Sequence, residues 1–81
     1  MMTKNDLKRL VVEALRSLGG SASLIDVSRF VWEHHELELR ESGALFYSWQ
    51  YELRWAAHEL RVNGSMRPAD VSPPGVWELQ S

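Results

Sequence analysis

The sequence predicts a mainly α-helical domain with a small β-hairpin, formed by residues 1–81 as a single unit. Three stretches before residue 63 carry apolar residues at the spacing of one helix face. The stretch after residue 63 contains three prolines and two glycines, which disfavour a further helix and favour short strands joined by a loop. A chain of this length buries only about 60% of its unfolded surface, so the 44% hydrophobic content suits one economical core.

The first predicted helix begins close to the N-terminus. Thr3 and Asp6 have the spacing of a capping box, with Asp6 in place of the usual Glu or Gln, and an acid in the first turn suits the helix dipole. Gly19 and Gly20 are expected to end the helix, because glycine adopts the left-handed conformation at little steric cost. The apolar face between these signals consists of Leu7, Leu10, Val11, Ala14, Leu15 and Leu18.

A second helix is predicted from about Leu24 to about His35, because Ser23 and Asp26 repeat the capping spacing. The stretch "SASL" that precedes it is long enough only for a stub of strand. The segment "ELELRESG" after His35 alternates Glu with Leu, which fits both an exposed strand and a helical turn. The apolar stripe of the second helix consists of Leu24, Val27, Phe30 and Val31.

A third helix is predicted from Leu45 to Val62. At 100° per residue, its apolar residues fall on one side, and its tyrosines and basic residues form a second stripe. The predicted core face comprises Phe46, Trp49, Leu53, Ala56, Ala57 and Leu60. The second stripe comprises Tyr47, Tyr51, Arg54, His58 and Arg61, whereas Glu52, Glu59, Ser48 and Trp55 lie on the opposite flank.

The C-terminal part of the chain predicts a hairpin. Asn63 and Gly64 end the third helix, and two short runs, Ser65–Arg67 and Val76–Leu79, are expected to form strands joined by a proline-bearing loop. Alternation along the second strand places Trp77 on the face that points back at the helices. Three helices followed by such a hairpin form the outline of a winged helix-turn-helix.

Charge and cysteine content restrict the classes of function. The net charge of −2 argues against non-specific coating of nucleic acid, although residues 4–18 carry a surplus of two positive charges and residues 20–45 a deficit of three. The absence of cysteine excludes disulfides and thiolate metal sites and suits a cytoplasmic protein. No apolar run approaches the ~20 residues that span a bilayer, so no membrane partner is expected.

Neither catalysis nor cofactor binding is expected from the sequence. It contains no paired nucleophile and base and no glycine-rich phosphate loop. The adjacent His34 and His35 point about 100° apart on a helix, so they are not expected to bind a metal. Four tryptophans could form a stacking pocket for a modified base, but Trp32, Trp49 and Trp77 are expected to pack in the core or the hairpin.

Two interpretations of the second stripe on the third helix remain open. In the first, the stripe lies on duplex DNA, where Arg54 and Arg61 meet phosphates or guanine edges and the tyrosines meet sugars or bases. In the second, the stripe binds another subunit or forms a homodimer, and the acidic pI near 5.9 favours this interpretation. An exposed helix also carries mixed charge for solubility alone, so the stripe by itself does not decide between them.

A linked pattern connects the third helix to the C-terminal strand. It consists of Arg54-Trp55-Ala56, Leu60, Gly64 and then Gly75, Trp77 and Leu79 within "GVWEL". In this order and spacing, the pattern resembles the N-terminal winged-helix domain of the Mrr family of restriction endonucleases. The segment "LRSLGG" matches the end of that domain's first helix, so the resemblance spans nearly the whole chain.

The resemblance implies a DNA-binding module that tests whether duplex DNA carries modified bases, and some related winged helices sense methylated adenine. It also implies that the module acts as a separate small protein or attached to a nuclease or regulator. Glu52-Leu53 departs from the basic or amide residues that often precede the family's arginine, and no cleavage activity carries over without a nuclease domain. The predicted DNA-contacting residues are Tyr47, Ser48, Tyr51, Arg54, Trp55, His58, Arg61 and Arg67.

Overall fold

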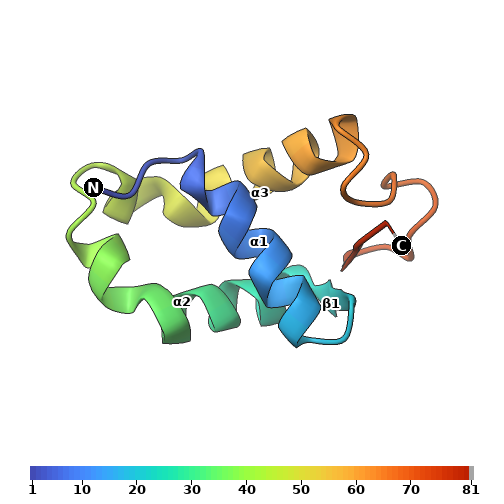
Figure 1. Cartoon of the computed structure of the whole chain (residues 1–81), viewed down its shortest axis with the longest axis horizontal. Coiled ribbons are helices and arrows are strands. Elements are labelled where there is room, and N and C mark those ends of the chain that lie inside the picture. The colour runs from blue at the N-terminus through green and yellow to red at the C-terminus, as the bar shows by residue number, and fades with distance from the viewer. Residues whose placement is uncertain (81) are drawn as a thin grey trace.

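Three helices and a two-stranded antiparallel sheet make up the protein in a computed structural model that describes residues 1–80 (Figure 1). Helix α1 lies across α2 and α3, and the sheet closes the end of the bundle where α1 ends and α2 begins (Figure 1). The coarse prediction of a mainly helical domain with a small sheet is therefore confirmed. In chain order, the elements are α1 (Asp6–Ser17), β1 (Ser21–Ser23), α2 (Leu24–Arg40), α3 (Leu45–Val62) and β2 (Val76–Glu78).

The predicted end of α1 is present, whereas only half of the predicted capping box forms, because the N-cap is Asn5 and no side chain accepts a hydrogen bond there. The backbone N–H of Thr3 donates to the Asp6 carboxylate at 2.8 Å, which ties the first turn to the preceding residues. At the other end, Gly20 N–H donates to the Leu15 carbonyl and Gly19 N–H to the Arg16 carbonyl, the pair of bonds that defines a Schellman motif. Both glycines have φ above +90°, a conformation that residues with a Cβ rarely adopt.

Helix α2 begins as predicted but ends later. The Ser23 hydroxyl accepts a hydrogen bond from the Asp26 N–H at 3.1 Å, which caps the start at Leu24. The predicted end near His35 is wrong, because the helix continues to Arg40 through a kink at which His35 has φ −134° and ψ 23°. The segment that fitted both strand and helix is therefore helical as far as Arg40. Leu39 beyond the kink is fully buried, and this burial favours continuation of the helix.

Helix α3 has the predicted limits and the predicted core face. Its buried residues are Trp49, Leu53, Ala56, Ala57 and Leu60, while Phe46 at the first turn is half-buried. These side chains join the apolar faces of α1 and α2 in one core cluster. The opposite side of α3 remains open to solvent, which determines where a partner can bind.

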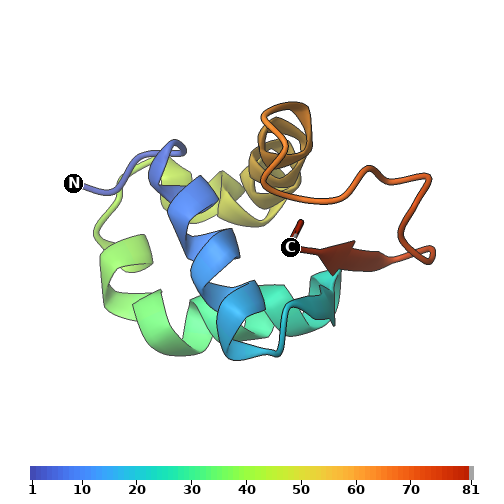
Figure 2. The same cartoon turned by 45° about the vertical axis from the view of Figure 1, so that its right-hand side comes forward.

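The sheet differs from the predicted hairpin. Strand β2 pairs along its length with β1, in the register Ala22 opposite Trp77, and not with Ser65–Arg67. The latter segment forms only a single bridge, Met66 with Leu79, supported by a 2.9 Å hydrogen bond from Arg67 N–H to the Glu78 carbonyl. Figure 2 shows β2 lying beside β1, with the loop before it arching away from the helices. The stub of strand at "SASL" therefore provides the main partner of β2.

A histidine joins the first two helices at the kink of α2. His35 contacts the Glu13 carboxylate of α1 at 2.6 Å through Nε2 and the Glu38 carboxylate at 2.8 Å through Nδ1. Two ionised carboxylates can only accept hydrogen bonds, so this geometry suits the doubly protonated imidazolium. Burial alone would lower the pKa of His35, but the hydrogen bonds and charges of both carboxylates outweigh burial and raise the pKa above its usual value.

The His35 contact predicts a pH dependence of stability. Because the pKa is higher in the folded state, protonated His35 stabilises the protein fully below the unfolded pKa of about 6.5, and this contribution is lost as pH rises through the folded pKa. Chemical denaturation at a series of pH values should therefore show the stability difference between wild type and His35→Gln shrinking as pH rises above about 6.5. A difference that widens with rising pH would contradict the ion-pair geometry.

Candidate nucleic-acid interface

The tyrosine and basic stripe of α3 faces solvent. Tyr47 is 87% exposed and Tyr51 74% exposed, so both aromatic rings are accessible to a partner. Arg54 and His58 are also exposed, whereas Arg61 is half-buried. The stripe lies outside the buried face of the helix and spans about 21 Å at 1.5 Å per residue.

The middle of the stripe borders a hollow that includes the N-terminal segment. Tyr51, Arg54, Trp55 and His58 line this hollow, together with Lys4 and Glu52. The Lys4 ammonium lies 4.5 Å from the centroid of the Trp55 ring, a distance that allows a cation–π contact. The predicted site residue Trp55 is therefore half-buried beside a lysine from outside α3. Sequence reasoning missed Lys4, although the positive surplus of residues 4–18 was a signal for it.

A second hollow separates the stripe from the start of α2. Arg54 also borders this hollow, where it is accompanied by Gln50 of α3 and by Ile25 and Arg29 of α2. Arg29 forms an exposed ion pair of 3.6 Å with Asp26, so its charge is partly compensated within α2. Gln50 and Arg29 add polar groups on either side of Arg54, and the helical wheel of α3 alone could not indicate Arg29.

The remaining predicted site residues lie toward the two ends of α3. Tyr47 and Ser48 border a shallow hollow at the first turns of the helix, and Ser48 is half-buried. At the C-terminal end, Arg61 Nε donates a hydrogen bond of 3.2 Å to the Arg67 carbonyl. One N–H of Arg61 thus holds the segment that leads into the loop. The predicted residues form three groups along the helix and do not surround a single pocket.

The charges on this face differ from those on the rest of the surface. Within residues 1–80, the ion pairs join residues of α1 and α2 only, so Arg54, Arg61 and Arg67 have no carboxylate partner. By contrast, the basic Arg40 of α2 is paired with Glu36 at 2.8 Å. The three arginines on this face are therefore available to an anionic partner, although Glu52 and Glu59 leave α3 neutral in sum.

The four tryptophans do not gather at one site. Trp49 and Trp77 are buried in the core, as predicted, and Trp32 is half-buried and stacks on Trp49 with ring centroids 6.0 Å apart. Arg40 lies 5.1 Å from the centroid of the Trp32 ring and covers it further. Trp49 also lines the hollows beside Arg54 and beside Tyr47, but it is only 5% exposed, so a base contacted here would meet chiefly the Trp55 indole.

Neither the structure of residues 1–80 nor comparison with known proteins indicates a membrane span, a metal site or a family. No helix in residues 1–80 is long and apolar enough to cross a membrane. No group of three or more His, Asp or Glu side chains among the same residues could hold a metal ion. Comparisons of the chain with protein-family models, curated proteins and solved structures found no match.

Proposed function

We propose that the protein is a DNA-binding winged helix-turn-helix module that contacts duplex DNA through the exposed stripe of α3 and distinguishes modified from unmodified bases. The observation that carries this proposal is the stripe itself, in which two exposed tyrosines are followed by the exposed Arg54 and His58 on the same side of α3. Duplex DNA presents phosphates for the basic groups and base edges and sugars for the aromatic groups.

The element order supports the winged-helix part of the proposal. Strand β1 stands between α1 and α2, and β2 follows α3, so the sheet joins the beginning of the helix pair to the end of the chain. Helix α3 then corresponds to the recognition helix, with its outer face free. The loop between Met66 and Val76 projects from the sheet as the wing would (Figure 2).

The two arginines of the stripe are assigned different roles. Arg54, near the middle of α3 and beside Tyr51, is the candidate for reading a base edge in the major groove. Arg61, near the C-terminal end of α3, is the candidate phosphate contact, since its Nε bonds the Arg67 carbonyl and its other guanidinium N–H groups can donate to a phosphate. Lys4 adds a positive charge at the edge of the same face, where it is suited to a phosphate on the DNA backbone.

Arg54→Ala is expected to weaken binding to a preferred duplex by about 1–3 kcal/mol, an effect concentrated at one base position. The matched control is Arg9→Ala, which removes the same charge from an exposed arginine of α1 and should alter affinity little. Fluorescence anisotropy with a labelled duplex measures both affinities, and far-UV circular dichroism verifies folding. Equal losses for the two variants would show that only net charge matters and would remove Arg54 from base reading.

The same titration tests base modification and phosphate contact. Duplexes of identical sequence, with and without N6-methyladenine, should differ in affinity for the wild type. At two or more salt concentrations, Arg61→Ala should reduce the salt slope by about one unit and weaken all duplexes alike.

The proposal fails if affinity is flat for every duplex while Arg54→Ala abolishes a dimer in size-exclusion chromatography. That result would favour the protein-interaction interpretation, which the net charge of −2 also supports.

A further inference from the structure

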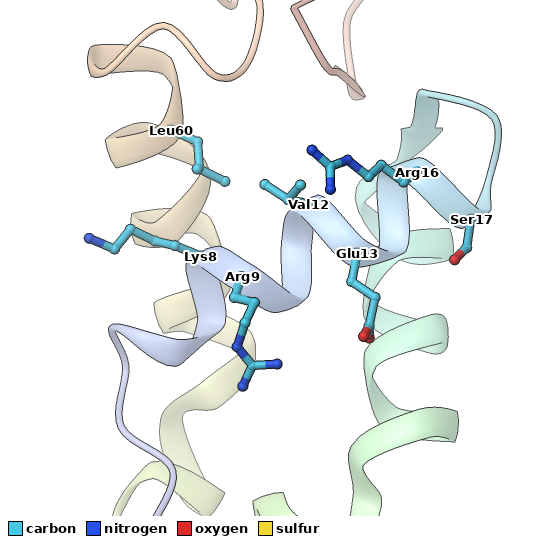
Figure 3. A pocket seen from close by; sticks show the side chains of 7 residues that line it. All are labelled: Lys8, Arg9, Val12, Glu13, Arg16, Ser17 and Leu60. Carbon is cyan, nitrogen blue, oxygen red and sulfur yellow. The ribbon is translucent and has the colours of Figure 1, made fainter.

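A second basic surface lies on α1, away from the stripe of α3. Lys8, Val12 and Arg16 follow one another at intervals of four residues, so they share one side of the helix. Figure 3 shows Val12 and Leu60 of α3 pointing toward each other across an open groove, with Lys8 and Arg16 along its edges. The groove is thus apolar in the middle and positively charged at both ends.

The charges of this groove are not compensated within the chain. Glu13 also borders the groove, but its carboxylate is directed to α2, where it contacts His35 at 2.6 Å (Figure 3). Within residues 1–80, no ion pair involves Lys8 or Arg16. Lys8 approaches the Trp55 ring at 5.7 Å, which leaves its charge available to an anionic partner. The groove therefore suits a partner that presents acidic groups on both sides of an apolar one.

The part of α2 around its kink at His35, together with the C-cap residue Glu41, presents such a pattern. Glu33, Leu37 and Glu41 also follow one another at intervals of four residues, and Leu37 is 68% exposed. The neighbouring acids are engaged, because Glu36 is paired with Arg40 and Glu38 with His35. Within residues 1–80, no ion pair involves Glu33 or Glu41. An exposed leucine between two unpaired glutamates has the charge and polarity pattern that complements the groove on α1.

We propose that the Lys8–Val12–Arg16 stripe of one copy of this chain binds the Glu33–Leu37–Glu41 stripe of a second copy. Each stripe spans nine residues, or eight intervals and about 12 Å along the chain, so Leu37 meets Val12 while the two acids meet the two bases. The contact joins two different surfaces: it closes a twofold dimer where two copies use it reciprocally, and otherwise it builds a ring or an open chain. This proposal uses no residue of the α3 stripe and is independent of DNA binding.

The apolar middle of the groove distinguishes a protein partner from nucleic acid. Val12 and Leu60 lie between the two basic groups, where a phosphate backbone would gain nothing from burying them. The exposed Leu37 supplies an apolar group of suitable size, and its flanking charges have the complementary sign. Charge complementarity also sets the register of the two helices, because a shift by one turn would place one acid opposite Val12 and the other beyond the basic stripe.

Sedimentation velocity on the wild type should show an average mass that rises above the 9.3 kDa monomer as the concentration approaches about 1 mM, and that falls again in high salt. Two charge-reversed proteins test the pairing: Lys8→Glu with Arg16→Glu, and Glu33→Lys with Glu41→Lys. Each alone should stay monomeric, because like charges then face each other. An equimolar mixture should associate, because every groove in one protein then matches a stripe in the other.

Two further variants separate the contact from folding and from net charge. Leu37→Ser should reduce association without changing the circular dichroism spectrum, since this side chain is exposed in the single chain. Asp70→Lys reverses a charge in the exposed loop and should leave association unchanged. The proposal is overturned if the wild type is monomeric throughout, if the reversed proteins associate alone, or if their mixture stays monomeric. Loss of DNA affinity in the Lys8→Glu, Arg16→Glu protein, without any self-association, would assign the groove to DNA instead.

Discussion

Replacement of Trp77 by alanine is expected to lower the free energy of unfolding by about 3–5 kcal/mol, because it truncates a large buried aromatic side chain. Trp77 is only 7% exposed and belongs to the core cluster formed by the three helices. It also occupies the centre of β2, directly opposite Ala22 of β1, so its loss would leave a cavity where the sheet meets the helices. Few other single truncations would loosen the sheet and the core together.

The size of this effect can be judged against the whole domain. At about 0.05–0.15 kcal/mol per residue, a chain of 81 residues has roughly 4–12 kcal/mol of stability to lose. Urea denaturation should therefore show the Trp77→Ala midpoint far below that of the wild type. Tyr47→Ala is the matched control, because it removes an aromatic ring that is 87% exposed and should change stability by less than about 0.5 kcal/mol. Equal midpoints for all three proteins would mean that Trp77 does not pack in the core.

The residues typical of helix starts and ends were sufficient to predict the helices that lie between them. Helix α3 could be placed from its apolar period alone, since Phe46, Leu53 and Leu60 recur on one face over about four turns and Gly64 follows the helix. The start of α2 could be placed from Ser23, whose hydroxyl forms the predicted capping bond. Such features depend on residues within one turn of each other and are therefore visible in sequence order.

Features that depend on distant residues could not be predicted in the same way. The main partner of β2 is β1, more than fifty positions earlier in the chain, and three residues of strand give no pattern from which to choose it. The end of α2 is similar, because the burial of Leu39 and the contact of His35 with Glu13 both require α1 to be in place. The sequence between these residues shows only an alternation of Glu and Leu.

The same division applies to the candidate interface. The α3 residues of the stripe could be named from the helical wheel, because one helix determines their common direction. Lys4 and Arg29 could not, since each approaches the stripe from another element through the tertiary fold. The wheel also placed Trp55 on the flank opposite the stripe, yet Trp55 borders the same hollow as Arg54 and His58. A hollow between elements brings together side chains that a single helix separates.

The two proposed surfaces leave each other free. The DNA-contacting stripe lies on α3, whereas self-association uses the outer sides of α1 and α2, and the two sets have no residue in common. Copies joined through α1 and α2 would therefore still expose their α3 stripes. Association along DNA would then raise the apparent affinity of each weakly binding copy through local concentration. This coupling would be useful for a chain whose net charge of −2 limits the affinity of a single copy.

Leu39→Ala is expected to lower the free energy of unfolding by about 2–5 kcal/mol, whereas Leu37→Ala should change it by less than about 0.5 kcal/mol. The two leucines are separated by one residue, and the sequence alone gives no reason to treat them differently. In a strand they would point to the same face, but in a helix they stand about 200° apart. In the structure Leu39 is fully buried, while Leu37 is 68% exposed.

Thermal and urea denaturation of the two variants would therefore test the extension of α2 beyond its kink at His35. Equal losses would indicate a strand-like alternation and would contradict the helical assignment of the whole segment. The two variants also distinguish an effect on stability from an effect on self-association, because Leu37→Ala should weaken self-association in a protein that is as stable as the wild type. Leu39→Ala should destabilise the end of α2. It should disturb the acidic stripe only if the last turn of the helix, which precedes Glu41, unfolds.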